Sequence, residues 1–377
     1  MNSKSIYSDN PEKTLWWMLA GYKNIDKVSQ EIISRHSSSD NAKKQAKQIK
    51  HCLEQAEEYF QAASVTSIAT QPLLLYYGMV SLSWALVLYK ATGDYALDRL
   101  NPDHLEHGLS RPLFQYSSRD KPLPDLLTEV ETTVSPLEGS QLRGTFGLLA
   151  QHSRLEPSSA SLTKLDGTVV VTMRSLFEAK STKNVVELAG RVLSLKDFFF
   201  QTPDMGPFLS ELGFRPSFAV VTQFTCQLRT DNSVLIDLMT SRCNEAEINS
   251  LEASFREHPG WTVRRLPSGV HARLHYQEGK RTGPGPIVSE TVHGHRYIYL
   301  PKDDLLPDPA RFLGAMFLLG MLVRYSPHVW MHFIDNRHPI VDAVEAFLPI
   351  AKRTFPNIIL NNLTGDSFRF SPPHEAR

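Results

Sequence analysis

The features of this sequence that most constrain its fold are two stretches without a charged side chain, Tyr59–Tyr89 and Phe312–Val323. The denser part of the first, Pro72–Tyr89, would form a helix nearly long enough to cross a hydrocarbon core of about 30 Å, at about 1.5 Å per residue. However, polar and aromatic residues such as Tyr76 and Trp84 lie in its middle, and no cluster of Lys or Arg flanks one side. We therefore expect two helices buried against each other rather than membrane spans.

Size and charge narrow the class of protein. At 377 residues the chain is longer than one typical core, and Lys+Arg and Asp+Glu both number 40, so no net charge attracts nucleic acid or an anionic membrane. A zero net charge is still compatible with a local basic patch that binds nucleic acid. Cys52, Cys226 and Cys243 are odd in number and far apart, which argues against a disulfide framework and a zinc knuckle. Residues 1–13 are polar and lack the apolar region of a secretory signal, so we expect a cytoplasmic protein.

The order of the expected elements is helical, then β-rich, then helical. Helical periodicity and capping signals dominate residues 1–165 and 306–377, whereas β-branched runs and turn signals dominate residues 166–305. We therefore predict an α+β fold in which the N- and C-terminal helical segments pack together around a shared core, with a largely antiparallel β-sheet region inserted between them.

Individual elements follow from the same signals, with Pro expected in first turns and Gly after last turns. Helices are expected at Thr14–Tyr22, from Asn41 (capped by Asp40) to Phe60, and at Pro72–Tyr89, Lys183–Leu193, Leu195–Phe200, Pro207–Leu212, Asn244–His258, Asp308–Tyr325, Pro339–Phe355 and Asn357–Leu363, with a polar tail after Gly365. Strands are expected at Gly167–Met173, Ser217–Arg229, Ser233–Met239, Trp261–Leu266, Val270–Tyr276, Ile287–Val292 and Arg296–Leu300.

Five segments spread over most of the chain resemble the YaaC-like family of bacterial proteins. They are Gln61-Ala62, Pro72–Tyr77 (PLLLYY), His107-Gly108-Leu109, Leu193–Met205 (LSLKDFFFQTPDM) and Arg324–Trp330 (RYSPHVW). The last two are the more specific. The resemblance implies a bacterial, cytoplasmic origin and a shared fold, but it transfers no catalytic residues, because the family has no settled activity.

The segment Arg324–Trp330 is the strongest candidate for a binding site. Arg324 ends an apolar helix and is followed by Tyr325, His328 and Trp330, which can place a guanidinium and an imidazole at one rim, suited to phosphate or carboxylate recognition. The structural alternative is that Arg324 caps the last carbonyls of the helix and Trp330 packs into the core. Both interpretations stay open from the sequence.

The same segment suggests a ribonuclease. Helical ribonucleases of the HEPN class (higher eukaryotes and prokaryotes nucleotide-binding domain) use an Arg followed, usually four to six residues later, by a His that acts on an RNA phosphodiester. Arg324 and His328 have only three residues between them, and Pro327 interrupts the helix on which such a pair would sit. This departure from the pattern weakens the hypothesis.

A second nuclease pattern surrounds the expected strand at Gly167–Met173. Asp166, Glu178 and Lys180 resemble the D…E-x-K arrangement of metal-dependent nucleases, in which carboxylates hold Mg²⁺ and the lysine helps to activate water. E-x-K is also common in charged loops, so a solvated loop is the favoured interpretation.

Histidine pairs and a basic loop complete the candidates. His293 and His295 lie in a tight turn without a third ligand, and His104 and His107 lie beside Pro and Gly, so turns or packing are favoured over metal binding. Lys280–Pro286 (KRTGPGP) lacks the setting of a phosphate-binding loop. We predict no metal site and identify no cofactor, except Mg²⁺ under the nuclease alternative.

The sequence thus favours a binding or regulatory subunit of a bacterial cytoplasmic protein complex, with a protein partner, no membrane, and Arg324, Tyr325, His328 and Trp330 as binding residues. The lack of a recognisable catalytic motif and the zero net charge support this interpretation. The alternative is a nuclease that uses Arg324 and His328, or Asp166, Glu178 and Lys180.

Overall fold

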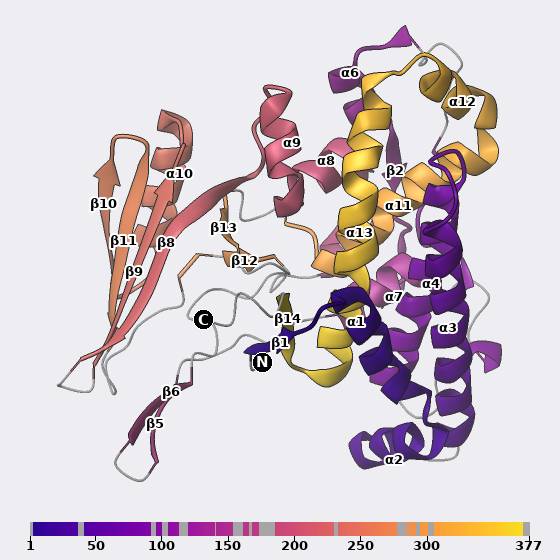
Figure 1. Cartoon of the computed structure of the whole chain (residues 1–377), viewed down its shortest axis with the longest axis horizontal. Coiled ribbons are helices and arrows are strands. Elements are labelled where there is room, and N and C mark those ends of the chain that lie inside the picture. The colour runs from indigo at the N-terminus through magenta and orange to yellow at the C-terminus, as the bar shows by residue number, and fades with distance from the viewer. Residues whose placement is uncertain are drawn as a thin grey trace.

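The structure, a computed structural model, consists of a body of long helices and an antiparallel sheet at its side (Figure 1). The predicted α+β fold, with the two helical ends of the chain packed together and the sheet inserted between them, is confirmed. The structure describes residues 3–36, 41–91, 96–99, 105–112, 120–139, 141–153, 161–165, 168–172, 185–229, 233–276, 285–286, 288–291, 295–300 and 305–371.

Helices from both ends of the chain build the helical body. Its long members are α2 (Ile25–Arg35), α3 (Ala42–Ala63), α4 (Gln71–Lys90), α11 (Asp308–Tyr325) and α13 (Pro339–Thr364). Shorter ones are α1 (Pro11–Ala20), α6 (Leu123–Glu129), α7 (Gly144–His152), α8 (Leu195–Phe200), α9 (Gly206–Glu211), α12 (Pro327–Asp335) and the 3-10 helices η1 (Gly21–Lys23), η2 (Leu97–Arg99), η4 (Val185–Leu188) and η5 (Pro203–Met205).

The two uncharged stretches form neighbouring core helices. Almost every side chain of α11 is buried, and α11 packs obliquely against α4 (Figure 1). A Cβ atom on Gly320 of α11 would lie 3.1 Å from the Cβ atom of Tyr76 in α4, so the two backbones approach closely there. Among the described helices α4 alone has the length and hydropathy of a membrane span, and 78% of that window is buried within the protein. These helices therefore organise the core.

The first uncharged stretch is not one continuous helix. α3 ends at Ala63, a turn follows, and Pro72 lies in the first turn of α4, where its missing N–H costs no hydrogen bond. Gly78 of α4 lies under the ring of Phe60 in α3. A Cβ atom on Gly78 would lie 2.7 Å from Cδ2 of Phe60, so only glycine allows this approach. This close contact holds α3 and α4 side by side.

The C-terminal helices differ from the sequence prediction in two places. Ser326 and Pro327 end α11 as expected, but Pro327 also begins α12, whose axis turns by 98° from that of α11. The predicted break at Pro356 was wrong, because α13 continues through Pro349 and Pro356. Burial of most of one face of α13 outweighs the two backbone hydrogen bonds that the prolines cannot donate.

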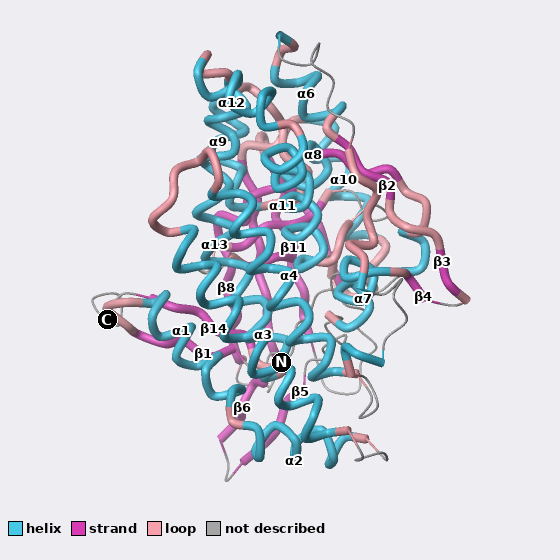
Figure 2. The backbone as a smooth tube through the Cα atoms, turned by 90° about the vertical axis from the view of Figure 1, so that its right-hand side faces the viewer, coloured by secondary structure: helices cyan, strands magenta, loops and turns pink. Residues whose placement is uncertain are grey.

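The sheet has six described strands in the order β10-β11-β9-β8-β13-β12. They are β8 (Phe218–Leu228), β9 (Val234–Ser241), β10 (Trp261–Leu266), β11 (Gly269–Tyr276), β12 (Val288–Glu290) and β13 (Arg296–Tyr299), all antiparallel neighbours. Helix α10 (Glu245–Arg256), capped by Asn244, covers one face, and its Phe255 packs against Trp261 in a buried cluster that includes Ile236 and Leu274. The sheet thus has a core of its own, and it lies behind the helices in Figure 2.

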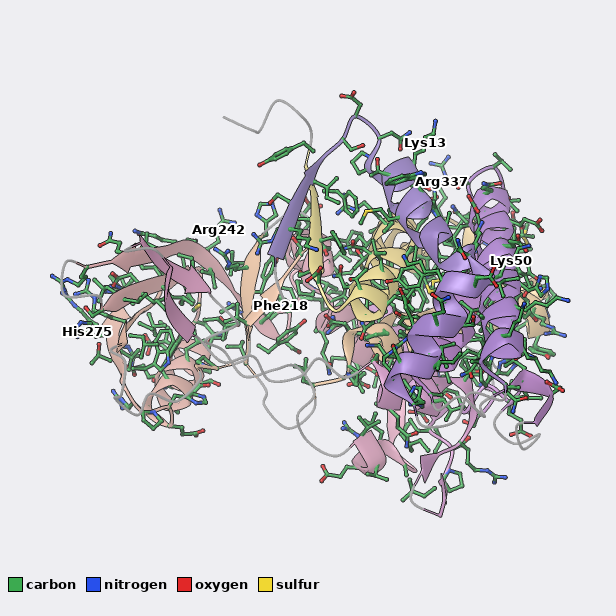
Figure 3. The ribbon with its side chains drawn as sticks, turned by 90° about the horizontal axis from the view of Figure 1, so that it is seen from below. Lys13, Lys50, Phe218, Arg242, His275 and Arg337 are labelled. Carbon is green, nitrogen blue, oxygen red and sulfur yellow. The ribbon has the colours of Figure 1, made fainter. Side chains whose placement is uncertain are left out.

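Phe218 lies where the sheet meets the helical body (Figure 3). Its ring packs edge-on against Tyr297 at 5.1 Å and fills the space beside Gly206 of α9. Next to it the buried Arg311 of α11 donates from Nη1 to the Tyr299 hydroxyl at 3.1 Å and from Nη2 to Asp308 at 2.6 Å. Apolar contacts and the hydrogen bond from Arg311 to Tyr299 together join the two parts.

The remaining strands form two-stranded ribbons. β1 (Ser3–Tyr7) pairs in parallel with β14 (Ser367–Ser371), where the sequence predicted polar ends. The helix expected at Lys183–Leu193 was wrong over its described part, which contains η4 and then the start of β7 (Val192–Ser194). β7 pairs with β2 (Glu131–Thr133); the other ribbons are β3 (Leu137–Glu138) with β4 (Gln141–Leu142) and β5 (Ser161–Leu165) with β6 (Thr168–Thr172).

Candidate functional site

The C-terminal end of α11 brings an exposed arginine to the first turns of α4. Arg324 lies in the last helical turn, and its Nη1 atom donates a hydrogen bond to the hydroxyl of Tyr77. The Tyr77 ring stacks on Tyr59 of α3 with 5.8 Å between ring centroids. Three helices therefore position one guanidinium group at the surface.

A second guanidinium lies beside the same helix end. The Cζ atoms of Arg324 and Arg111 lie 5.0 Å and 4.8 Å from the ring centroid of Tyr325, within the range of cation–π attraction. Arg111 is exposed and Tyr325 is 44% exposed. In the part of the chain that the structure describes, neither arginine pairs with a carboxylate. The surface around Tyr325 is therefore cationic.

A buried tyrosine and a histidine lie beneath this surface. The Tyr76 hydroxyl and the Nδ1 atom of His107 are 2.6 Å apart, and both rings pack against Phe317 of α11. Burial, and then the positive charge of Arg324, lower the pKa of His107, while Glu106 acts in the opposite direction. Burial raises the pKa of Tyr76. At neutral pH the imidazole and the phenol are therefore both uncharged.

Two glycines fix the loop that carries His107. Gly108 has φ +77° and Gly144 has φ +72°, a region of backbone space that favours glycine. A Cβ atom on Gly108 would lie 2.4 Å from the carbonyl oxygen of Arg143, so the two backbones are in contact. The Phe146 N–H also donates to the His107 carbonyl at 3.0 Å. The loop is thereby held against the start of α7.

The residues of the predicted binding segment have different environments. Arg324, Tyr325 and His328 are exposed, but His328 lies in α12, beyond the 98° bend that separates it from Arg324. Trp330 is 1% exposed, and its indole Nε1 donates to the carbonyl of Ile68 at 3.2 Å. Trp330 thus ties α12 to the α3–α4 turn.

Several other candidates lie outside the described residues. These are Asp166, Glu178, Lys180, His104, His293 and most of Lys280–Pro286; the cap at Asp40 also lies outside. His295 is described and is exposed just before β13. Within the described ranges, no group of three His, Cys, Asp or Glu side chains is placed to hold a metal ion.

The arrangement offers two guanidinium groups, a neutral imidazole and three tyrosine hydroxyl groups. Guanidinium groups are suited to bidentate recognition of phosphate and carboxylate. The sequence prediction missed Arg111, His107, Tyr76 and Tyr77 as members of this site. A signal was present, because three of the segments that carry the family resemblance, Pro72–Tyr77, His107-Gly108-Leu109 and Arg324–Trp330, meet here.

Comparison with known proteins supplies a family. The model of one family, described as YaaC-like protein, matches residues 21–363, which include the whole site. No curated protein and no solved structure matches the chain.

Proposed function

The chain belongs to the YaaC-like protein family, and on that premise we propose that it is a binding or regulatory subunit of a bacterial cytoplasmic complex that recognises an oxyanion at Arg111 and Arg324. Phosphate and carboxylate are the two chemical classes that the guanidinium groups fit. The oxyanion is carried by the protein or small molecule that the subunit binds.

One observation carries this proposal: two exposed guanidinium groups, those of Arg111 and Arg324, both lie beside the ring of Tyr325. Among the described residues, no carboxylate pairs with either of them. Because both Cζ atoms lie within 5.0 Å of one ring centroid, the two positive charges repel each other, and a bound anion reduces that repulsion. Tyr77 holds Arg324 in place before a ligand arrives, which reduces the entropy lost on binding.

Binding of inorganic phosphate, measured by isothermal titration calorimetry at low salt, tests the proposal. We expect Arg324→Gln and Arg111→Gln each to weaken binding by about tenfold, the loss of a hydrogen bond between charged groups. Lys50→Gln removes one positive charge from α3, at a half-buried lysine that pairs with Glu54, and is the charge control (Figure 3). Equal phosphate affinities of the wild type and all three variants would contradict the proposed site.

The nuclease alternative gains no support from the geometry of Arg324 and His328, which lie on helices at 98° to each other. Incubation of the purified protein with RNA and DNA, with and without Mg²⁺, tests it directly. Cleavage that is abolished by Arg324→Ala or Lys180→Ala would replace the binding function with a nuclease function.

A further inference from the structure

His107 is a titratable group next to the oxyanion site. Its ring lies 5.6 Å from the ring of Tyr76 and 5.4 Å from that of Phe317, between the start of α4 and α11. The positive charge of Arg324 reaches it and contributes to lowering the pKa of the imidazole. The protonation of His107 and the charge on the site are therefore coupled.

The groups that face His107 come from three elements. Tyr76 on α4 contributes its hydroxyl, and Arg324 on α11 contributes a positive charge. Glu106, the preceding residue, is exposed and contributes a negative charge. The start of α7 contributes backbone groups, including the Phe146 N–H that binds the His107 carbonyl. Burial and Arg324 together favour the neutral imidazole.

The Tyr76 hydroxyl can serve both protonation states of the histidine. Burial raises the pKa of Tyr76, so its hydroxyl keeps its proton. It can donate to Nδ1 of a neutral imidazole or, by rotating, accept from the Nδ1–H of an imidazolium at the same 2.6 Å separation. Proton uptake by His107 therefore keeps the Tyr76–His107 hydrogen bond, with its direction reversed.

An anion bound to Arg324 removes the positive charge that opposes protonation of His107. A dianion would offset both guanidinium charges, whereas a monoanion would leave one of them in place and would favour protonation less. Resting on the oxyanion-binding function proposed above, we propose that the ligand carries a dianionic oxyanion, such as a phosphate monoester, and that His107 takes up one proton from solvent when it binds.

Sulfate is the probe for this proposal, because it keeps two negative charges from pH 6 to pH 8, whereas phosphate titrates in that range. Calorimetry in buffers of different ionisation enthalpy gives the number of protons taken up per sulfate bound. We expect net uptake and a sulfate affinity that rises by about fivefold or more from pH 8 to pH 6. Acetate, a monoanion, is expected to bind more weakly and to take up less.

Two substitutions assign the proton. In His107→Gln and His107→Asn we expect sulfate to bind without proton uptake and with an affinity that no longer changes with pH. His275→Gln, in the sheet and far from the helical body, is the histidine control and should retain the uptake (Figure 3). If both His107 variants fail to fold, NMR titration of the wild-type histidine ring protons replaces them, and one pKa that rises with sulfate is expected.

The outcomes separate the two proposals. Sulfate binding that depends on Arg324 but takes up no proton overturns the role of His107 and leaves the oxyanion-binding function. Uptake that persists in both His107 variants, or no ring resonance that shifts, also overturns the role of His107. Acetate that binds as tightly as sulfate overturns the dianion class. Absence of sulfate and phosphate binding overturns both proposals.

Discussion

The guanidinium of Arg324 donates to the hydroxyl of Tyr77, 247 positions earlier in the chain, so the end of one core helix is fixed to the start of another. Tyr77→Phe removes this acceptor and keeps the ring. We expect sulfate to bind about three- to tenfold more weakly, because a hydrogen bond to a charged group is lost at an exposed position. Tyr59→Phe, in the stacked neighbouring ring, is the control for calorimetry. Equal affinities of wild type and Tyr77→Phe would show that the tyrosine does not position Arg324.

Close packing of α11 against α8 leaves no room for a side chain at Gly314. A Cβ atom there would lie 2.4 Å from Cζ of Phe198, which is buried. We expect Gly314→Ala to lower the free energy of unfolding by about 1–3 kcal/mol, measured in urea. Gly21→Ala is the control, since a Cβ atom at Gly21 would have no other atom within 4 Å and the φ of this residue is −58°. A fully stable Gly314→Ala protein would mean that Phe198 has another place to go.

Trp330 is expected to stabilise the fold without taking part in anion binding. Trp330→Phe removes the hydrogen bond to the Ile68 carbonyl and part of a buried side chain. We expect a loss of about 1–3 kcal/mol in the free energy of unfolding and an unchanged sulfate affinity. A selective loss of sulfate binding with normal stability would return Trp330 to the binding residues.

Acid should destabilise the protein through its half-buried histidines, His107 and His152. Burial lowers the pKa of His107 and of His152 below the ordinary value of 6.5, so the unfolded chain binds protons more readily than the folded one. Stability is therefore complete above about pH 6.5 and is lost as the pH falls from there toward the folded pKa. We expect a lower urea midpoint at pH 5.5 than at pH 7.5, and a smaller difference in His107→Gln. A midpoint that rises toward pH 5.5 would contradict the sign.

α4 should keep the protein out of the membrane despite its hydropathy, because most of its apolar window is covered by the rest of the protein. After cell lysis and ultracentrifugation we expect the protein in the supernatant without detergent. Release only by detergent would mean that α4 faces lipid.

Sequence patterns predicted elements best where local chemistry decides. Asn244 forms a capping box with Glu247, and α8 begins and ends at the predicted residues. Patterns failed where tertiary packing decides. Helix α12 begins at Pro327, but the sequence predicted only the end of α11 there. Proline can follow the last turn of one helix or lie in the first turn of the next, so local pattern does not distinguish the two.

The site was predicted only in part, for the same reason. Arg324 and Tyr325 follow an apolar helix and are conspicuous, whereas Arg111 and His107 lie in a segment of short apolar groups without helical or strand periodicity. No local signal shows that Gly108 packs on Gly144 and so directs that segment toward α11. Among the described residues, the side-chain partner of His107 is a core tyrosine, Tyr76, as the interpretation that favoured packing over metal binding allows.

Helix α11 follows the strands of the sheet in the sequence, and this order has a consequence for biosynthesis. Tyr76 and His107 leave the ribosome early, whereas Arg324 follows only after β8 to β13 have been made. A nascent chain therefore exposes the partners of α11 for many seconds before α11 arrives, at about 5–20 residues per second. During that interval the face of α4 that later packs against α11 is exposed apolar surface, which is the kind of surface that chaperones bind.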